Sequence, residues 1–144
     1  MIRPSTVDDA ASMVDMAERF HQSAPLPSPL GFSRLAAAQT FLAVLDNPDC
    51  LALTLDLGRP RGALLAHLAP YPLSGVPVAK EIVFWVDPDA RGPWARQMVE
   101  SYEAWSRARG ARLAGLSCFA DGRTHLLFQR LGFRVAEINT VKEL

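Results

Sequence analysis

The sequence predicts an α/β or α+β fold with a single mixed, mostly antiparallel central sheet of about six or seven strands, flanked by four helices. Three observations favour this class. Strand-like and helix-like segments alternate along the chain, a glycine- and proline-containing turn at 58–62 joins two apolar runs, and the run at 81–86 is rich in β-branched and aromatic residues. The 144 residues are 49% apolar and 21% charged, so we expect one domain over residues 1–144 with a sizeable core.

The first segments predict a short strand and two helices. Residues 2–4 suit a strand, and Thr6 with Asp9 forms a capping-box pattern before a helix with apolar residues on one face. Prolines at 25, 27 and 29 predict an extended surface loop. Ser33 is a candidate N-cap for a second helix, which ends at 46–48. Its predicted apolar residues are Leu35, Ala38, Leu42 and Leu45.

The middle of the chain predicts a meander followed by a helix. Residues 50–57 and 63–69 read as antiparallel strands joined by the turn at 58–62. Residues 81–86 suit a central strand that is covered on both faces. Pro93 suits the first turn of a helix, which ends at Gly110 and repeats Ala95, Met98, Val99 and Tyr102 at helical spacing.

The last segments predict a strand, a helix and a strand. Residues 113–119 read as a buried strand, and Asp121 is the predicted start of a short helix that stops at Gly132. Residues 133–144 complete the sheet as a last strand in this prediction.

Composition and spacing exclude several classes of function. Fifteen basic and fifteen acidic residues leave no net charge, and the arginine-rich stretch at 107–112 lacks interleaved aromatic residues, so we expect no nucleic-acid partner. The histidines share no ligand spacing and the two cysteines form no C-x-x-C pair, so no metal site is expected. The acidic start of the chain and the short apolar runs predict a cytoplasmic protein without a membrane partner.

The order of elements, the turn VDPDARG from Val86 to Gly92 and the run FQRLGF from Phe128 to Phe133 resemble the GNAT family of acyl-CoA-dependent N-acetyltransferases over essentially the whole chain. Small phage-type members with a V-D-P-x-x-R-G turn are the most similar in pattern. The resemblance implies a GNAT-like fold, with acetyl-CoA as co-substrate and direct attack of a primary amine on its thioester. It does not name the amine, which could belong to a small molecule or a peptide.

The resemblance implies a cofactor loop after the strand at 81–86. The family pattern R/Q-x-x-G-x-G/A places backbone amides around the pyrophosphate of coenzyme A at a helix N-terminus. The matching residues are Arg91, Gly92, Pro93, Trp94, Ala95 and Arg96. A backbone N–H near Val86 is implied as a donor to the thioester oxygen.

Trp94 and Arg96 occupy positions where the family has small residues. The indole of Trp94 could fill the phosphate space, or it could turn into the core or solvent and leave the amides of Trp94, Ala95 and Arg96 free. Arg96 could add a charge-assisted contact to the pyrophosphate. Arg91 and Gly92 could also be an ordinary strand-to-helix turn.

The resemblance also implies catalytic positions. A glutamate on the fourth strand, here Glu81, removes a proton from the amine in many members, although a lone glutamate can also be an exposed sheet residue. A tyrosine commonly protonates the departing thiolate, and Phe128 stands at its position. Because a thiol has a pKa of ~8.5, its thiolate can leave without an acid, at a cost on the order of 10² in rate.

Two classes of function remain open at this point. The first is an acetyl-CoA-dependent N-acetyltransferase. The second is a GNAT fold that has lost turnover and acts as a binding or structural module, associated with a phage particle or another assembly. In either case the resemblance implies a homodimer that pairs through sheet edges or the last strand.

Overall fold

The computed structural model describes residues 1–24, 28–119 and 123–144. Its centre is a five-stranded sheet in the order β1-β2-β3-β4-β5. The strands are β1 (Ile2–Pro4), β2 (Cys50–Asp56), β3 (Pro60–Pro70), β4 (Pro77–Val86) and β5 (Leu113–Gly115). The first four pair in antiparallel fashion, and β5 runs parallel to β4.

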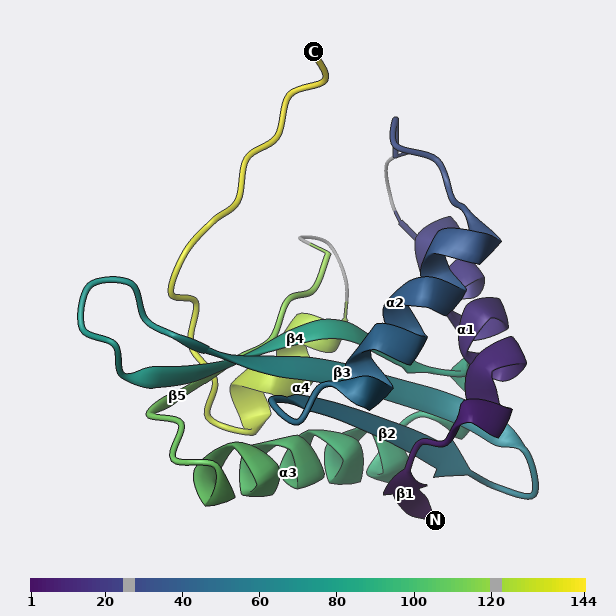
Figure 1. The fold of residues 1–144 in the computed structure, drawn as a ribbon, viewed down its shortest axis with the longest axis horizontal. Coiled ribbons are helices and arrows are strands. Elements are labelled where there is room, and N and C mark those ends of the chain that lie inside the picture. Colours follow the sequence, from purple (N-terminus) through teal and green to yellow (C-terminus); the bar gives the residue numbers. More distant parts are fainter. Residues whose placement is uncertain (25–27, 120–122) are drawn as a thin grey trace.

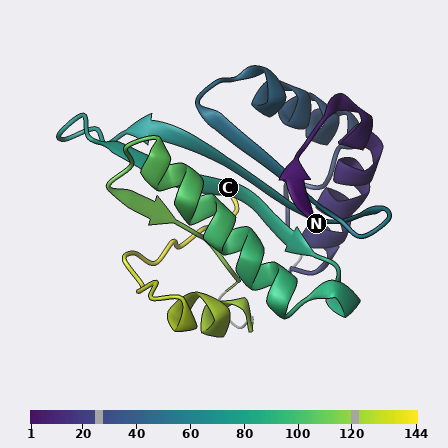
Figure 2. The same ribbon diagram turned by 90° about the horizontal axis from the view of Figure 1, so that it is seen from below.

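The helices lie on both faces of the sheet (Figure 1). They are α1 (Ala10–Gln22), α2 (Arg34–Asp46), α3 (Pro93–Ala108) and α4 (Thr124–Arg130). Helices α1 and α2 lie together on one face, and α3 crosses the other face, as the view from below shows (Figure 2). The predicted mixed, mostly antiparallel sheet with four helices is therefore confirmed.

Two apolar clusters fix these layers. The cluster under α1 and α2 includes Met16, Phe41 and Trp85. The cluster under α3 includes Leu64, Met98 and Tyr102. Both rest on β3 and β4, whose residues are apolar on both faces, and this double burial makes these two strands the centre of the sheet.

The predicted helix starts are largely confirmed. The Thr6 N–H donates to Asp9 Oδ2 at 2.8 Å in the capping box, and a short 3-10 helix over Val7–Asp9 precedes α1. Ser33 Oγ accepts from the Ala36 N–H at 3.1 Å at the start of α2. The predicted loop residues 25–27 and the predicted start of α4 at Asp121 lie outside the described residues.

The predicted apolar face of α2 is correct for Leu45, which packs against the cluster under α1 and α2, and wrong for Leu35 and Leu42. Phe41 and Val44 are buried, whereas Leu35 is 69% exposed and Leu42 is 39% exposed. Helix α2 is apolar on most of its surface, so periodicity alone could not identify the side that packs against α1 and the sheet.

The predicted six or seven strands are also too many. Only residues 113–115 of the predicted strand at 113–119 pair with a neighbour, and residues 133–144 form no strand in the described part of the chain. Figure 1 shows the chain after α4 running away from the sheet. Its alternating apolar residues predicted pairing, but pairing also requires a neighbouring strand edge, which a sequence pattern does not supply.

Candidate functional site

The candidate site begins where β4 and β5 part. The parallel ladder joins Val78–Lys80 to Leu113–Gly115 and stops there. From Glu81 to Val86, β4 has a partner in β3 but none on the β5 side among the described residues. A strand edge with open N–H and C=O groups can bind an extended ligand as an added strand would bind.

A β-bulge determines which side chains face α3 at this opening. Ala66 pairs with Glu81 and Leu65 pairs with Val83, so Ile82 is the extra residue. Ile82 and Val83 both pack towards α1 and α2. The bulge therefore puts Glu81 on the same side as the α3 cluster, together with Phe84.

Glu81 is held by the backbone that follows β5. Its Oε2 accepts a hydrogen bond from the Ser117 N–H at 3.0 Å. Burial raises the pKa of the Glu81 carboxyl, and the Ser117 N–H opposes this effect by stabilising the charged form. A carboxylate with a raised pKa is a stronger base than an exposed one, so Glu81 is chemically suited to remove a proton.

Tyr102 on α3 holds the end of β5, next to Glu81. Its side chain is fully buried, and its hydroxyl donates to the Gly115 carbonyl at 2.9 Å. Burial and the nearby charge of Glu81 raise the pKa of Tyr102 well above its ordinary value, so the phenol keeps its proton. The same two causes raise the pKa of the Cys118 thiol, which is therefore a poor nucleophile.

The turn from β4 into α3 ends at an exposed helix N-terminus. Gly92 has φ +86° and ψ −120°, a conformation that side chains strongly disfavour, and a Cβ there would meet open space. The N–H groups of Trp94 and Ala95 donate no backbone hydrogen bond within the described ranges. Unpaired amides in the first turn of a helix attract anions.

The side chains of Trp94 and Arg91 in this turn contact other parts of the protein. Trp94 is half-buried and packs against the α3 cluster. Arg91 Nε donates to the Val86 carbonyl at 3.0 Å, and its guanidinium lies over the Trp85 ring, 5.3 Å from the ring centroid. Trp94 thus takes the inward orientation among those the sequence left open, and the Arg91 side chain stabilises the turn.

Arg96 is already engaged by its own helix. Its N–H donates to the Gly92 carbonyl at 3.2 Å, and its Nε pairs with Glu100 at 2.7 Å on the exposed surface. Of the three amides that the sequence suggested, those of Trp94 and Ala95 have no backbone acceptor among the described residues. Val86 is buried at the end of β4.

Phe128 lies beside this opening on α4. It is 5% exposed, and its ring centroid is 6.1 Å from that of Phe84 and 5.9 Å from that of Phe133. The position that resembles the family's tyrosine therefore contributes an apolar wall next to the β4 edge, and it has no proton to donate.

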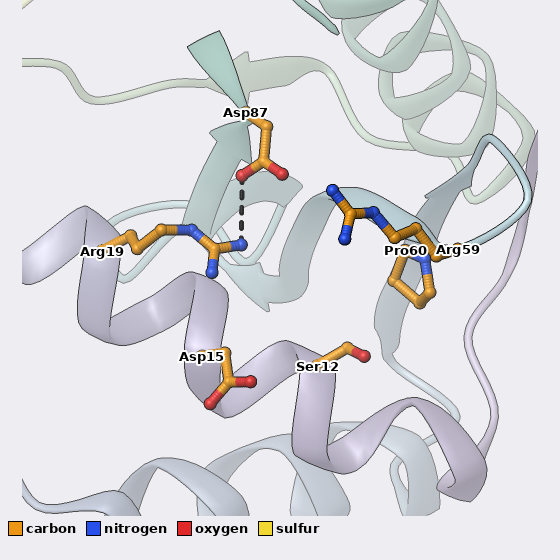
Figure 3. Close-up of a pocket in the computed structure, with 6 residues that line it drawn as sticks. All are labelled: Ser12, Asp15, Arg19, Arg59, Pro60 and Asp87. Carbon is orange, nitrogen blue, oxygen red and sulfur yellow. Dashed lines mark hydrogen bonds and ion pairs between the residues drawn. The ribbon is translucent and has the colours of Figure 1, made fainter. Parts of the chain in front are cut away.

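A separate polar cavity lies on the α1 side of the same turn (Figure 3). Its volume is about 180 Å³, and it is lined by Ser12, Asp15, Arg19, Arg59, Pro60 and Asp87. None of the predicted site residues lines it.

Asp87 is the best-bonded group of this cavity. It accepts hydrogen bonds from Trp85, Arg61 and Arg19 at 2.9, 2.8 and 3.1 Å. Burial alone would raise the pKa of the Asp87 carboxyl, but the Trp85 and Arg61 hydrogen bonds and the Arg19 charge together hold it below its ordinary value. Asp87 thus stays ionised and ties the end of β4 to α1 and to β3.

Sequence reasoning did not identify three of these groups: Ser117 as the partner of Glu81, the Tyr102 hydroxyl, and Asp87 as the centre of an ion-pair network. The pairing of Arg61 with Asp87 and Asp89 has a weak sequence signal, because acidic residues after one strand face a basic hairpin turn on its neighbour. The other two depend on where the chain leaves β5. Within the described residues no group of three or more His, Cys, Asp or Glu side chains could hold a metal, and no helix is both long and apolar enough to cross a membrane.

Solved structures with the same fold include several acetyltransferases. The tetramutant of the BH1408 protein from Bacillus halodurans superposes with a TM-score of 0.82 at 17% identity, with 100% of this chain and 99% of that chain covered. The aminoglycoside 6'-N-acetyltransferase AAC(6')-Ig from Acinetobacter haemolyticus has a TM-score of 0.77 at 17% identity, with the same coverage. The ribosomal-protein-alanine N-acetyltransferase from Brucella melitensis biovar Abortus 2308 has a TM-score of 0.74 at 16% identity, also with 100% and 99% covered.

These similarities show that the chain shares its fold with these two acetyltransferases, in agreement with the GNAT-like fold that the resemblance implied. No protein-family model matches the sequence, and no curated protein matches it. Nothing in these comparisons supports the similarity to phage-type members.

Proposed function

We propose that the protein is an acetyl-CoA-dependent N-acetyltransferase that transfers an acetyl group to a primary amine by direct attack in a ternary complex. One observation carries the proposal. Among the described residues, the edge of β4 from Glu81 to Val86 is open on the β5 side, and the Trp94 and Ala95 amides at the start of the next helix have no backbone acceptor. An edge that ends in an anion site fits an extended ligand with a phosphate end.

The residues of this turn are compatible with coenzyme A. Trp94 packs against the α3 cluster, and Gly92, with φ +86°, is the residue at which the chain enters α3. In this proposal Trp94 and Ala95 hold the pyrophosphate through their N–H groups, while Arg91, Gly92 and Arg96 maintain the turn. Val86 is the proposed backbone donor near the thioester oxygen.

Glu81 is the proposed general base. A primary amine is protonated at neutral pH, because its pKa is ~10, and it cannot attack until a proton is removed. Glu81 Oε takes that proton, and burial keeps the carboxyl a useful acceptor. Acetyl-CoA supplies the activated carbonyl: the neutral amine nitrogen bonds to its carbon, the nitrogen gives up its second proton to water, and the C–S bond breaks. The departing thiolate takes a proton from water, because Phe128 has none to donate.

The setting of this activity is also part of the proposal. The proposed acceptor is an amine on a small molecule or a peptide, and no metal takes part in the reaction. Neither nucleic acid nor a membrane is a partner. The protein works in the cytoplasm as a single domain that forms a homodimer. The acetyltransferase fold favours this proposal over a binding or structural module without turnover.

Isothermal titration with acetyl-CoA and with S-acetylpantetheine, which lacks the pyrophosphate, tests the proposal. We expect micromolar affinity for acetyl-CoA and at least a ~10-fold weaker affinity for the truncated ligand, which cannot reach the helix N-terminus. The absence of heat with millimolar acetyl-CoA would reject the transferase and favour the module.

A further inference from the structure

The hydrogen bond between Glu81 and Ser117 has a consequence for cofactor binding. The Ser117 N–H lies just beyond the end of the β4–β5 ladder, on the exposed chain that borders the opening. It has no backbone acceptor in the part of the chain that the structure describes, and the Glu81 side chain serves in place of one. The carboxylate thus bridges the opening at the point where an inserted ligand has to separate the two strands.

Neighbouring contacts hold the chain on both sides of Ser117: Leu116 packs against the α3 cluster, and the Phe119 ring stacks on Phe20 of α1 with the centroids 5.4 Å apart. The Tyr102 hydroxyl fixes the Gly115 carbonyl to α3. Beyond Gly115, the only hydrogen bond of the described segment 116–119 to β4 is the one from Ser117 to Glu81. Release of the Ser117 N–H from β4 therefore breaks one hydrogen bond in the described segment, while the β4–β5 ladder stays paired.

We propose that the bond from the Ser117 N–H to the Glu81 carboxylate is a latch that closes the β4–β5 opening in the free protein and is released on acetyl-CoA binding. In the complex, the Ser117 N–H is donated to the bound cofactor. The same exchange frees the Glu81 carboxylate to accept the proton of the amine. This inference rests on the proposed function.

The latch links acetyl-CoA binding to the pKa of Glu81, the proposed base. The groups that face Glu81 are the Ser117 N–H, the Tyr102 phenol on α3 and the Cys118 thiol. The phenol and the thiol are neutral near pH 7, because their ordinary pKa values already lie above 7 and are raised further here. Loss of the Ser117 N–H removes the one contact that lowers the pKa of Glu81, so release raises it further and strengthens the base.

Two sets of variants separate the two partners of the latch. Glu81→Ala removes the competing acceptor but keeps the Ser117 N–H, so acetyl-CoA binds ~3- to 10-fold more tightly in calorimetry. Ser117→Pro removes the N–H itself and weakens binding by a similar factor, whereas Ser117→Ala, the matched control, keeps the N–H and leaves the affinity unchanged. A Glu81→Ala variant that binds acetyl-CoA equally or more weakly overturns the latch.

A direct readout in the unaltered protein is the Ser117 amide resonance. In the free protein it follows the protonation of Glu81 during a pH titration, because its acceptor changes charge. In saturating acetyl-CoA this dependence disappears. If acetyl-CoA binds and the Ser117 amide still follows Glu81, the latch is wrong and the proposed function stands; if acetyl-CoA does not bind at all, the proposed function falls and the latch falls with it.

Discussion

Arg91 Nε donates a hydrogen bond to the carbonyl of Val86 at 3.0 Å, and this contact closes the turn between β4 and α3. The guanidinium also lies over Trp85. Arg91 therefore stabilises the backbone turn that precedes the first-turn amides of α3. Its guanidinium is already engaged by the Val86 carbonyl and the Trp85 ring.

Substitution of Arg91 tests this role. Arg91→Met keeps the apolar stem but removes the hydrogen bond and the cation–π contact, so we expect a loss of roughly 1–2 kcal/mol in the free energy of unfolding. Chemical denaturation measures it. Arg96→Met is the control, because an exposed i,i+4 pair contributes about 0.5 kcal/mol or less. Equal effects of the two substitutions would contradict a structural role for Arg91.

Gly92 is the position at which the turn is most sensitive. At φ +86° any side chain is strained, so Gly92→Ala should cost about 1–3 kcal/mol or twist the amides of Trp94 and Ala95. We expect acetyl-CoA affinity to fall at least ~10-fold in calorimetry. Gly58→Ala is the matched control, because Gly58 has a similar φ of +84° but lies in the hairpin between β2 and β3. It should lose stability and keep its affinity; a parallel loss of affinity in both variants would contradict the site.

Trp94 is expected to act on stability and not on affinity. Its indole packs against the α3 cluster, so Trp94→Gly should lower the free energy of unfolding by roughly 2–4 kcal/mol through lost burial and added backbone freedom. Acetyl-CoA affinity, measured at a temperature where the variant is folded, should change less than ~3-fold. Binding that tightens strongly in Trp94→Gly would instead identify the indole as an obstruction.

Asp9 makes the fold sensitive to acid. Hydrogen bonds from Arg3 at 2.8 and 2.9 Å lower the pKa of this buried carboxyl, with further help from the Thr6 N–H and Thr54. Because the pKa is lower in the folded state, this stabilisation is present above the unfolded pKa near 4 and is lost as pH falls through the folded value.

The variant Asp9→Asn removes that dependence. We expect a loss of about 2–4 kcal/mol at pH 7, since the Arg3 guanidinium loses its anionic partner, and a smaller difference from the wild type at pH 3. Urea denaturation at the two pH values measures both. A deficit that is the same at pH 3 and pH 7 would show that ionisation of Asp9 is not the cause.

The contribution of Glu81 to stability depends on pH in the opposite direction from that of Asp9. Burial raises its folded pKa, so its contribution to stability is greatest below the unfolded pKa and is lost as pH rises through the folded value. Glu81→Gln should therefore be more stable than the wild type at pH 8 in thermal denaturation. Its acetyl-transfer rate should fall by ~10²–10⁴ if Glu81 is the base. A variant of normal rate would assign the proton transfer to another group.

The sequence predicted those parts of the fold that depend on local pattern. The capping residues Thr6 and Ser33, the hairpin between β2 and β3, and the buried face of α3 all follow from short-range rules and are confirmed. The packed side of α2 and the pairing of residues 133–144 depend on long-range contacts. The first was predicted wrongly at Leu35 and Leu42, and the second was wrong in the described part of the chain.

In the candidate site, too, the sequence predicted the features that depend on local pattern and missed those that depend on long-range contacts. The turn at 91–96 could be found from its order of residues, because a glycine and a proline at the start of a helix have fixed backbone preferences. The bond between Glu81 and Ser117 could not, because it depends on where β5 stops pairing with β4. The direction of the Arg91 and Trp94 side chains likewise depends on Val86, Trp85 and the core beneath α3.

The most direct test of the proposed site is an amide-resolved titration of the ¹⁵N-labelled protein with acetyl-CoA. The account predicts that the largest shifts fall on Trp94, Ala95 and the edge of β4 from Glu81 to Val86. Shifts confined to the cavity beside Arg19 and Arg59, or no shift at millimolar acetyl-CoA, would contradict it.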